Sequence, residues 1–147
     1  MSALREMIRD SLKKEFIGLE IAVFDFDDTL VGSFWGLEPI PEMMARFRQT
    51  ISRLGVENVF ILTARDDGDP VRNFLNSQGV PDIRIYVVGE GGAQAKADVI
   101  RAEVLARGVE LVTFYDDLIE NIDAVAGLRS ELPLTKIVTV QVKRTSV

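Results

Sequence analysis

Short apolar runs alternate with longer one-sided patterns along most of this chain. Strand-like runs bounded by polar or glycine-rich residues lie at about 19–24, 58–62, 83–88, 110–115 and 136–142. Between them, apolar residues recur at helical spacing, most clearly over 41–54 and 93–106. Strands joined by helices pair in parallel, because each right-handed crossover returns the chain to the same edge. The pattern therefore predicts an α/β fold with a five-stranded parallel sheet and helices on both faces.

The N-terminal stretch has a different pattern. Leu4, Ile8, Leu12 and Phe16 lie four residues apart with charged residues between them, which predicts an amphipathic helix over about 2–17. We expect this helix to cover part of the sheet rather than to bind a partner or a lipid surface. No linker or internal repeat divides the chain, so a single domain over 1–147 is expected, with 1–18 as a helix packed on it.

Composition removes several kinds of chemistry. The 147 residues contain no cysteine and no histidine, which excludes thiolate sites, serine–histidine hydrolysis and histidine-ligated zinc. Any hydrolysis must then use carboxylates, hydroxyls and lysine, and any metal must accept oxygen ligands, as Mg²⁺ does. The net charge of -6 argues against an extended grip on nucleic acid. No apolar run reaches the roughly 18 residues of a membrane span, and we expect a soluble, cytoplasmic protein.

Polar residues follow the apolar runs at the points where the strands should end. Asp25 and Asp27 follow the first run, Thr63 the second, and Asp116–Asp117 the fourth, while Lys96 stands early in the helical stretch between the last two. Ligands of open parallel sheets bind outside the carboxyl ends of the strands, where neighbouring loops converge. The four groups are therefore predicted to meet. Each alone has a bland explanation as a turn, a helix cap or a solvated side chain.

With these residues in order, the chain resembles phosphatases of the haloacid dehalogenase superfamily. Their four motifs are Asp-x-Asp-x-Thr after strand one, Ser or Thr after strand two, a later Lys, and an acidic pair after strand four, and the match spans 21–117. The resemblance implies a three-layer, doubly wound, Rossmann-like sandwich with strand order 5-4-1-2-3 and Asp25 on the central strand. The intervals between the motifs are too short for the cap domain that many relatives carry.

The same resemblance implies catalytic roles. Asp25 would be the nucleophile that forms an aspartyl-phosphate, and Asp27 would protonate the leaving group and then activate water. Thr63 and Lys96 would hold the phosphoryl oxygens. Asp28 and Thr29 are expected to be structural.

A Mg²⁺ ion is implied as cofactor. Its ligands would be Asp25, the backbone carbonyl of Asp27 and one residue of the acidic pair, where Asp117 is favoured with Asp116 supporting it. Together Mg²⁺ and Lys96 would offset the repulsion between the carboxylates and a phosphate.

A capless site would admit a phosphate on a large molecule. Arg65, just past Thr63, is placed to meet a second anionic group, and Trp35 or Phe34 in the loop after the first motif could stack on a base. Thr63-Ala64-Arg65 and Tyr115-Asp116-Asp117 are also similar to the phosphatase half of polynucleotide kinase-phosphatases, which suggests nucleotide or polynucleotide phosphate ends as substrates.

Two other functions stay open. One is a catalytically silent relative that binds phosphorylated partners. The other is a small-metabolite phosphatase whose site is closed by a second copy of the chain in a homo-oligomer.

Overall fold

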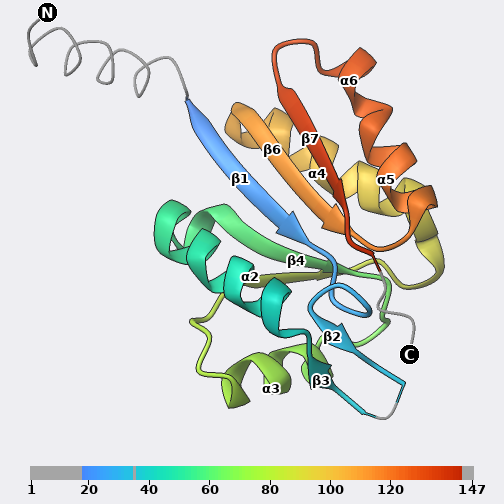
Figure 1. Ribbon diagram of the computed structural model, residues 1–147. Helices are drawn as coiled ribbons and strands as arrows, with labels where there is room; N and C mark the ends of the chain where they lie inside the picture. Colours follow the sequence, from blue (N-terminus) through green and yellow to red (C-terminus); the bar gives the residue numbers. More distant parts are fainter. Residues whose placement is uncertain (1–17, 35, 144–147) are drawn as a thin grey trace, which may run out of the picture.

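The computed structural model describes residues 18–34 and 36–143 and shows an α/β fold (Figure 1). Its centre is a five-stranded sheet, as predicted, in which every neighbouring pair is parallel. The strands are β1 (Leu19–Phe24), β4 (Val59–Thr63), β5 (Arg84–Val87), β6 (Val109–Asp116) and β7 (Lys136–Gln141). The N-terminal helix expected over about 2–17 and the residue Trp35 lie outside the described residues.

The strand labels differ from those of the expected order. The sheet runs β5-β4-β1-β6-β7, and the same strands, counted without the two short strands of a hairpin, follow the expected order 5-4-1-2-3 when read from β7. The expected numbers counted five strands, whereas the described chain also forms β2 (Val31–Gly32) and β3 (Glu38–Pro39), an antiparallel hairpin after the first motif. These two short strands raise the numbers of all strands that follow. The central place of β1 is confirmed, with β4 on one side and β6 on the other.

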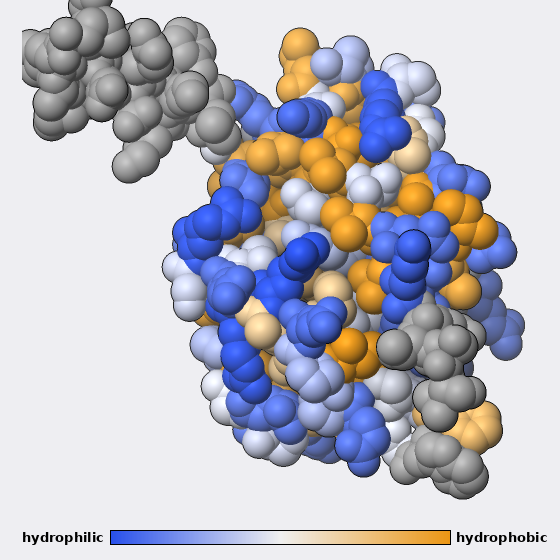
Figure 2. Space-filling model, viewed as in Figure 1, coloured by the Kyte–Doolittle hydropathy of each residue, from blue (hydrophilic) through white to orange (hydrophobic). Residues whose placement is uncertain are grey.

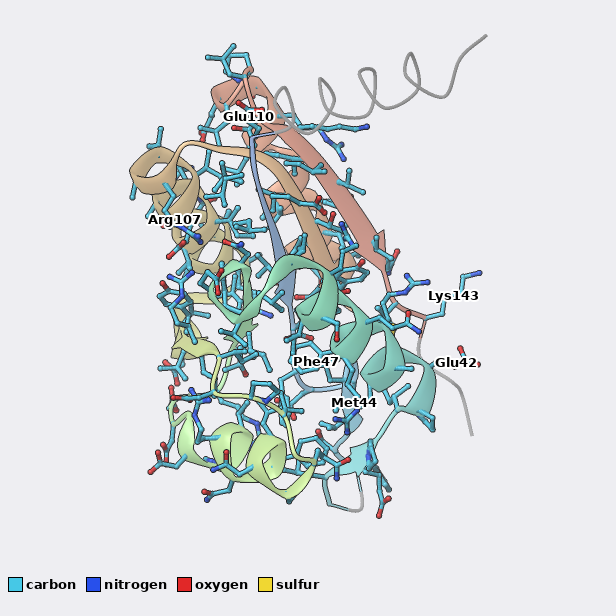
Figure 3. The ribbon with its side chains drawn as sticks, turned by 90° about the vertical axis from the view of Figure 1, so that its left-hand side faces the viewer. Glu42, Met44, Phe47, Arg107, Glu110 and Lys143 are labelled. Carbon is cyan, nitrogen blue, oxygen red and sulfur yellow. The ribbon has the colours of Figure 1, made fainter. Side chains whose placement is uncertain are left out.

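Alternate residues of β1 and β4 point to opposite faces of the sheet. On one face, Ala22, Phe24 and Ile61 pack against α2 (Pro41–Leu54) and α3 (Asp69–Ser77). Met44 and Phe47 point from α2 toward the sheet in Figure 3 and are almost completely buried. The helix predicted over 41–54 is therefore confirmed. Its apolar stripe packs against the sheet.

The other face carries the remaining helices. Ile21, Val23, Phe60 and Leu62 point this way and pack with α4 (Gly92–Arg107), α5 (Ile119–Ala126) and α6 (Leu128–Glu131). Gly108 ends α4 in the left-handed conformation, with φ 66°, and its N–H donates to the carbonyl of Val104. The described chain thus has helices on both faces of the sheet (Figure 1).

Segments between the motifs are short. The hairpin and α2 connect β1 to β4, and α3, β5 and a single 3₁₀ turn (Gly89–Gly91) lie between β4 and α4. Another 3₁₀ turn, Val56–Asn58, precedes β4. Within residues 18–34 and 36–143 no inserted cap domain is present. None of the helices in this part of the chain is long and apolar enough to cross a membrane.

Candidate active site

Three strand ends meet at one edge of the sheet. Asp25 follows β1 directly, Thr63 is the last residue of β4, and Asp116 is the last residue of β6. The backbone N–H of Asp25 donates to the carbonyl of Tyr115 at 2.9 Å, so the ladder between β1 and β6 continues into the site. The predicted convergence of the strand ends is thereby observed.

Lys96 crosses the site from α4 and joins two of the strands. Its Nζ donates to Oδ1 of Asp25 at 2.8 Å and to Oδ2 of Asp116 at 2.9 Å. The lysine side chain is only 1% exposed. Burial alone would lower the pKa of Lys96, but the charges and hydrogen bonds of the two carboxylates outweigh it and raise the pKa. Lys96 is thus a buried cation, and the predicted meeting of the later lysine with both acidic motifs holds.

Both carboxylate oxygens of Asp25 are held in place. Oδ1 accepts from Lys96, and Oδ2 accepts from the hydroxyl of Thr29 at 2.9 Å. Burial raises the pKa of Asp25 to about 7, with the nearby charge of Asp116 adding to it, although Lys96 and Thr29 act in the opposite direction. Thr29, expected to be structural, therefore also positions the carboxylate of Asp25. The signal for this contact in the sequence is the Thr of the Asp-x-Asp-x-Thr motif.

Asp27 has a different environment. Arg65 grips its carboxylate with two hydrogen bonds, from Nε to Oδ2 at 2.9 Å and from a terminal nitrogen to Oδ1 at 2.8 Å. The hydroxyl of Ser33 also donates to Oδ1. Burial acts to raise the pKa of Asp27, but the hydrogen bonds of Arg65 and Ser33 and the charge of Arg65 lower it. The sequence predicted neither the hydrogen bond from Ser33 nor the ion pair with Arg65. For the ion pair, no local sequence pattern links residue 27 to residue 65.

A compact loop connects the two first-motif carboxylates to the hairpin. The carbonyl of Phe26 accepts from the N–H groups of Thr29, Leu30 and Val31 at 3.3, 2.9 and 3.2 Å. Asp28 turns the chain with φ 61°, a conformation that Asp tolerates better than most residues, and its N–H donates to the carbonyl of Val31. Asp28 thus has the structural role expected of it.

Asp116 is completely buried and fully engaged. Besides Lys96, its Oδ2 accepts from the side-chain amide of Asn121 at 3.0 Å, and its Oδ1 accepts from the N–H of Leu118 at 2.9 Å. Asn121, in the first turn of α5, was not predicted from the sequence. Its position, five residues after an acidic strand end, was the available signal.

Three carboxylates are close enough to share a cation. Ligand oxygens of Asp25, Asp116 and Asp117 lie within 4.8 Å of one another, and all three residues are buried. Their formal charge is -3, and Lys96, with a charge of +1, forms ion pairs with two of them, Asp25 and Asp116. An all-oxygen donor set with excess negative charge suits Mg²⁺. Asp117 borders the pocket described next and Asp116 does not, which fits Asp117 as direct ligand and Asp116 as support.

A small pocket of about 120 Å³ opens above the cluster. Its volume corresponds to a few water molecules, enough for a phosphate group but not for the rest of a substrate. The lining residues are Asp25, Asp27, Asp28, Ala64, Lys96, Asp117, Leu118 and Asn121. Larger hollows elsewhere on the described surface contain none of these groups.

Thr63 and Arg65 lie differently from the other predicted residues. Thr63 is completely buried, and its hydroxyl accepts from the N–H of Arg65 at 3.2 Å rather than bordering the pocket. The guanidinium of Arg65 faces Asp27 and lies 5.6 Å from the ring centroid of Phe26. Arg65 was predicted to contact an anionic group of a substrate. In this structure its guanidinium donates instead to the carboxylate of Asp27.

In comparisons with known proteins, no family model and no curated protein matches the chain.

Proposed function

We propose that the protein is a Mg²⁺-dependent phosphomonoester hydrolase in which Asp25 is the nucleophile. The main support is the way Lys96 and Thr29 fix Asp25 at a pocket that Asp27 and Asp117 also border. A nucleophile, a second carboxylate, a buried cation and an all-oxygen cation site are the groups that phosphoryl transfer requires. We also propose the three-layer, doubly wound fold of the haloacid dehalogenase superfamily.

The chemistry follows from the two first-motif carboxylates. Arg65 and Ser33 keep Asp27 ionised in the free protein, so Asp27 first takes the proton of the phosphate monoanion as the substrate binds. A carboxylate oxygen of Asp25 then attacks phosphorus, and the bond from phosphorus to the ester oxygen breaks while Asp27 donates this proton to that oxygen. Water then attacks the phosphorus of the aspartyl-phosphate, Asp27 takes its proton, and inorganic phosphate leaves with Asp25 restored. Asp27 can reach solvent, whereas Asp25 is nearly buried, and this difference matches the two roles.

Cations make the attack of one anion on another feasible. Lys96 neutralises part of the charge of Asp25 and Asp116 before any phosphate arrives. Asp25, Asp117 and the backbone carbonyl of Asp27 would hold Mg²⁺, with Asp116 supporting them. When bound, the ion would offset charge on the transferred phosphoryl oxygens.

The direct test is release of phosphate from p-nitrophenyl phosphate with Mg²⁺ and with EDTA. Activity that EDTA removes and Mg²⁺ restores is expected. A screen of sugar phosphates, mononucleotides, phosphopeptides and 3′-phosphorylated oligonucleotides would then define the substrate class. No turnover on any of these would favour the catalytically silent, phosphate-binding alternative.

Substitution of Asp27 should separate the roles of the two first-motif carboxylates. Asp27→Asn keeps the shape but cannot move a proton, so alkyl phosphates should slow by roughly 10²-fold or more, because general acid catalysis contributes about that much. Aryl phosphates, whose leaving groups need little protonation, should slow far less. Initial rates on a matched alkyl and aryl pair measure the difference.

Arg65→Lys is the matched control for that measurement, since it keeps the charge and loses the two-point grip. If Arg65 acts by holding Asp27, Arg65→Lys should reproduce the alkyl-selective loss and add little to Asp27→Asn. A raised KM with an unchanged kcat would instead show that Arg65 contacts substrate. Equal losses on alkyl and aryl substrates in Asp27→Asn would refute its role as acid.

The two residues of the fourth motif should differ in metal dependence. Asp117→Ala should raise the Mg²⁺ concentration for half-maximal activity by about tenfold or more, because it removes a direct ligand at the pocket. Asp116→Ala should shift this concentration less and destabilise the fold more, because it removes one of the two carboxylate partners of Lys96 and the acceptor of the Asn121 amide. Metal titrations and urea unfolding measure both, and the reverse order would overturn the assignment.

A further inference from the structure

Within the part of the chain that the structure describes, the sheet face on the α2 side is only partly covered over β6 and β7. Val112, Phe114 and Ile137 point to the opposite face, where α4, α5 and α6 bury them. Their neighbours along the strands, Leu111, Thr113, Tyr115, Val138 and Val140, point to the α2 side and are only partly buried. Figure 2 shows apolar surface over β6 and β7 on this face. Most of these side chains are apolar, so the face is suited to a packing partner.

The uncovered strip has the width of one helix. Among the described elements, α2 packs on β1 and β4. Neighbouring strands lie about 4.8 Å apart and packed helices about 8–10 Å apart, so the next helix position lies two strands away, over β6 and β7. A hollow of about 480 Å³ between the start of α2 and the end of β7 marks one end of this strip. Glu42 and Lys143 border it from the two sides (Figure 3).

The chain supplies a segment that begins at the other end of the strip. Residues 1–17 join the sheet at Gly18, whose N–H donates to the carboxylate of Glu110 at 2.7 Å, and Leu19 pairs with Val109. In Figure 3 Glu110 lies near the top, at the start of β6, and Lys143 lies lower, past the end of β7. The segment therefore enters beside β6, at the edge from which a helix could run back along the uncovered face.

We infer that residues 4–16 form a helix that packs on this face of β6 and β7 within the same chain, with Leu4, Ile8, Leu12 and Phe16 toward the sheet. The stripe from Leu4 to Phe16 would be about 18 Å long at 1.5 Å per residue. The half-buried stretch of β6 from Leu111 to Tyr115 covers about 13 Å at 3.3 Å per residue. On this geometry Leu12 lies level with Val138, and Leu4 lies near the end of β7.

The helix would also support the acidic loop. The side-chain amide of Gln141 donates to the carbonyl of Asp117 at 3.3 Å, and the N–H of Val142 donates to the carbonyl of Asp116 at 2.8 Å. Gln141 is the last residue of β7 and Val142 is the next, so both donors come directly after the apolar residues of this strand. Packing on that strand would thus restrain the loop that holds Asp116 and Asp117, whatever reaction the site performs.

The test uses the absence of cysteine in the full chain. A double variant, Leu12→Cys with Val138→Cys, is treated with the shortest bifunctional thiol reagent and run on a denaturing gel. The control pairs Asp10→Cys with Val138→Cys, because residues two apart on a helix point to nearly opposite sides. Cross-linking within one chain is expected for the first pair, at least fivefold faster than for the control. Urea unfolding of both variants confirms that they are folded.

Three results would overturn the inference. Cross-linked dimers at low protein concentration would place the segment on a second copy. A faster reaction of Leu12→Cys with Leu134→Cys would place the N-terminal segment in another hollow, near the end of α4 and the start of β6. Leu105, Leu132 and Leu134 line that hollow. Equal rates for Leu12→Cys and Asp10→Cys would show that the segment covers neither surface and is free for a partner or lipid. None of these readouts depends on phosphatase activity.

Discussion

Asp25→Asn should lower turnover of any phosphomonoester by at least about 10³-fold, because it removes the nucleophilic oxygen on which the proposed reaction depends. The amide keeps the shape of the side chain and can still accept from Lys96 or Thr29. The fold should therefore persist. Single-turnover phosphate release and circular dichroism measure the two effects.

The same variant has a second expected signature in the absence of metal. The pKa of Asp25 in the folded protein is about 7, against an ordinary value of 3.8. A raised folded-state pKa gives stability that is full below the ordinary pKa and is lost as pH rises through about 7. At pH 8 the wild type therefore carries an unfavourable buried charge that Asn lacks. We expect the metal-free variant to unfold at a midpoint no lower than that of wild type, and a clearly lower midpoint would contradict this account of the site.

Lys96→Met should both inactivate and destabilise the protein. The lysine ammonium is buried between two carboxylates, and removal of one partner of a buried ion pair typically costs about 3–5 kcal/mol, because the remaining charges are uncompensated. Methionine keeps most of the side-chain volume, so the loss reports the charge rather than a cavity. Urea unfolding in EDTA gives the free energy of unfolding.

Two controls make that result specific. Lys136→Met removes an exposed lysine at the start of β7 and should change stability by no more than about 0.5 kcal/mol. Adding Asp116→Asn to Lys96→Met removes one uncompensated carboxylate and should recover part of the lost stability, as coupled groups do. If Lys96→Met proved as stable as Lys136→Met, the buried cation would have no structural importance.

The features that the sequence predicted well are those with a local signal. Phe24 and Ile61 lie in apolar runs that can be recognised without knowing their neighbours, and the glycine after α4 marks its end. The first helical residue of α3 shows the limit of such signals. An Asp followed by Pro, as at Asp69–Pro70, favours the Asp as N-cap, but Gly68 has that position, and the carboxylate of Asp67 accepts from the N–H of Asp69.

The candidate site was predictable as a set of residues and not as a network. That Asp25, Lys96 and Asp116 would converge follows from strand order, because parallel strands end at one edge. The burial of Lys96 and the pairing of Arg65 with Asp27 depend on side chains 71 and 38 residues apart. No local pattern carries such contacts, since they arise only once the strands are assembled.

The loop after β1 has a consequence for how the site meets a ligand. Three N–H groups converge on the carbonyl of Phe26, so the backbone between the first two acidic residues and the hairpin forms one hydrogen-bonded unit. Ordering a residue's backbone costs about 1–2 kcal/mol of conformational entropy. In this chain that entropy is lost once, during folding, and not at each encounter with a ligand. The two carboxylates are therefore held in a nearly fixed arrangement, and binding a ligand would require little reorganisation of them. Oriented groups react fastest under that condition.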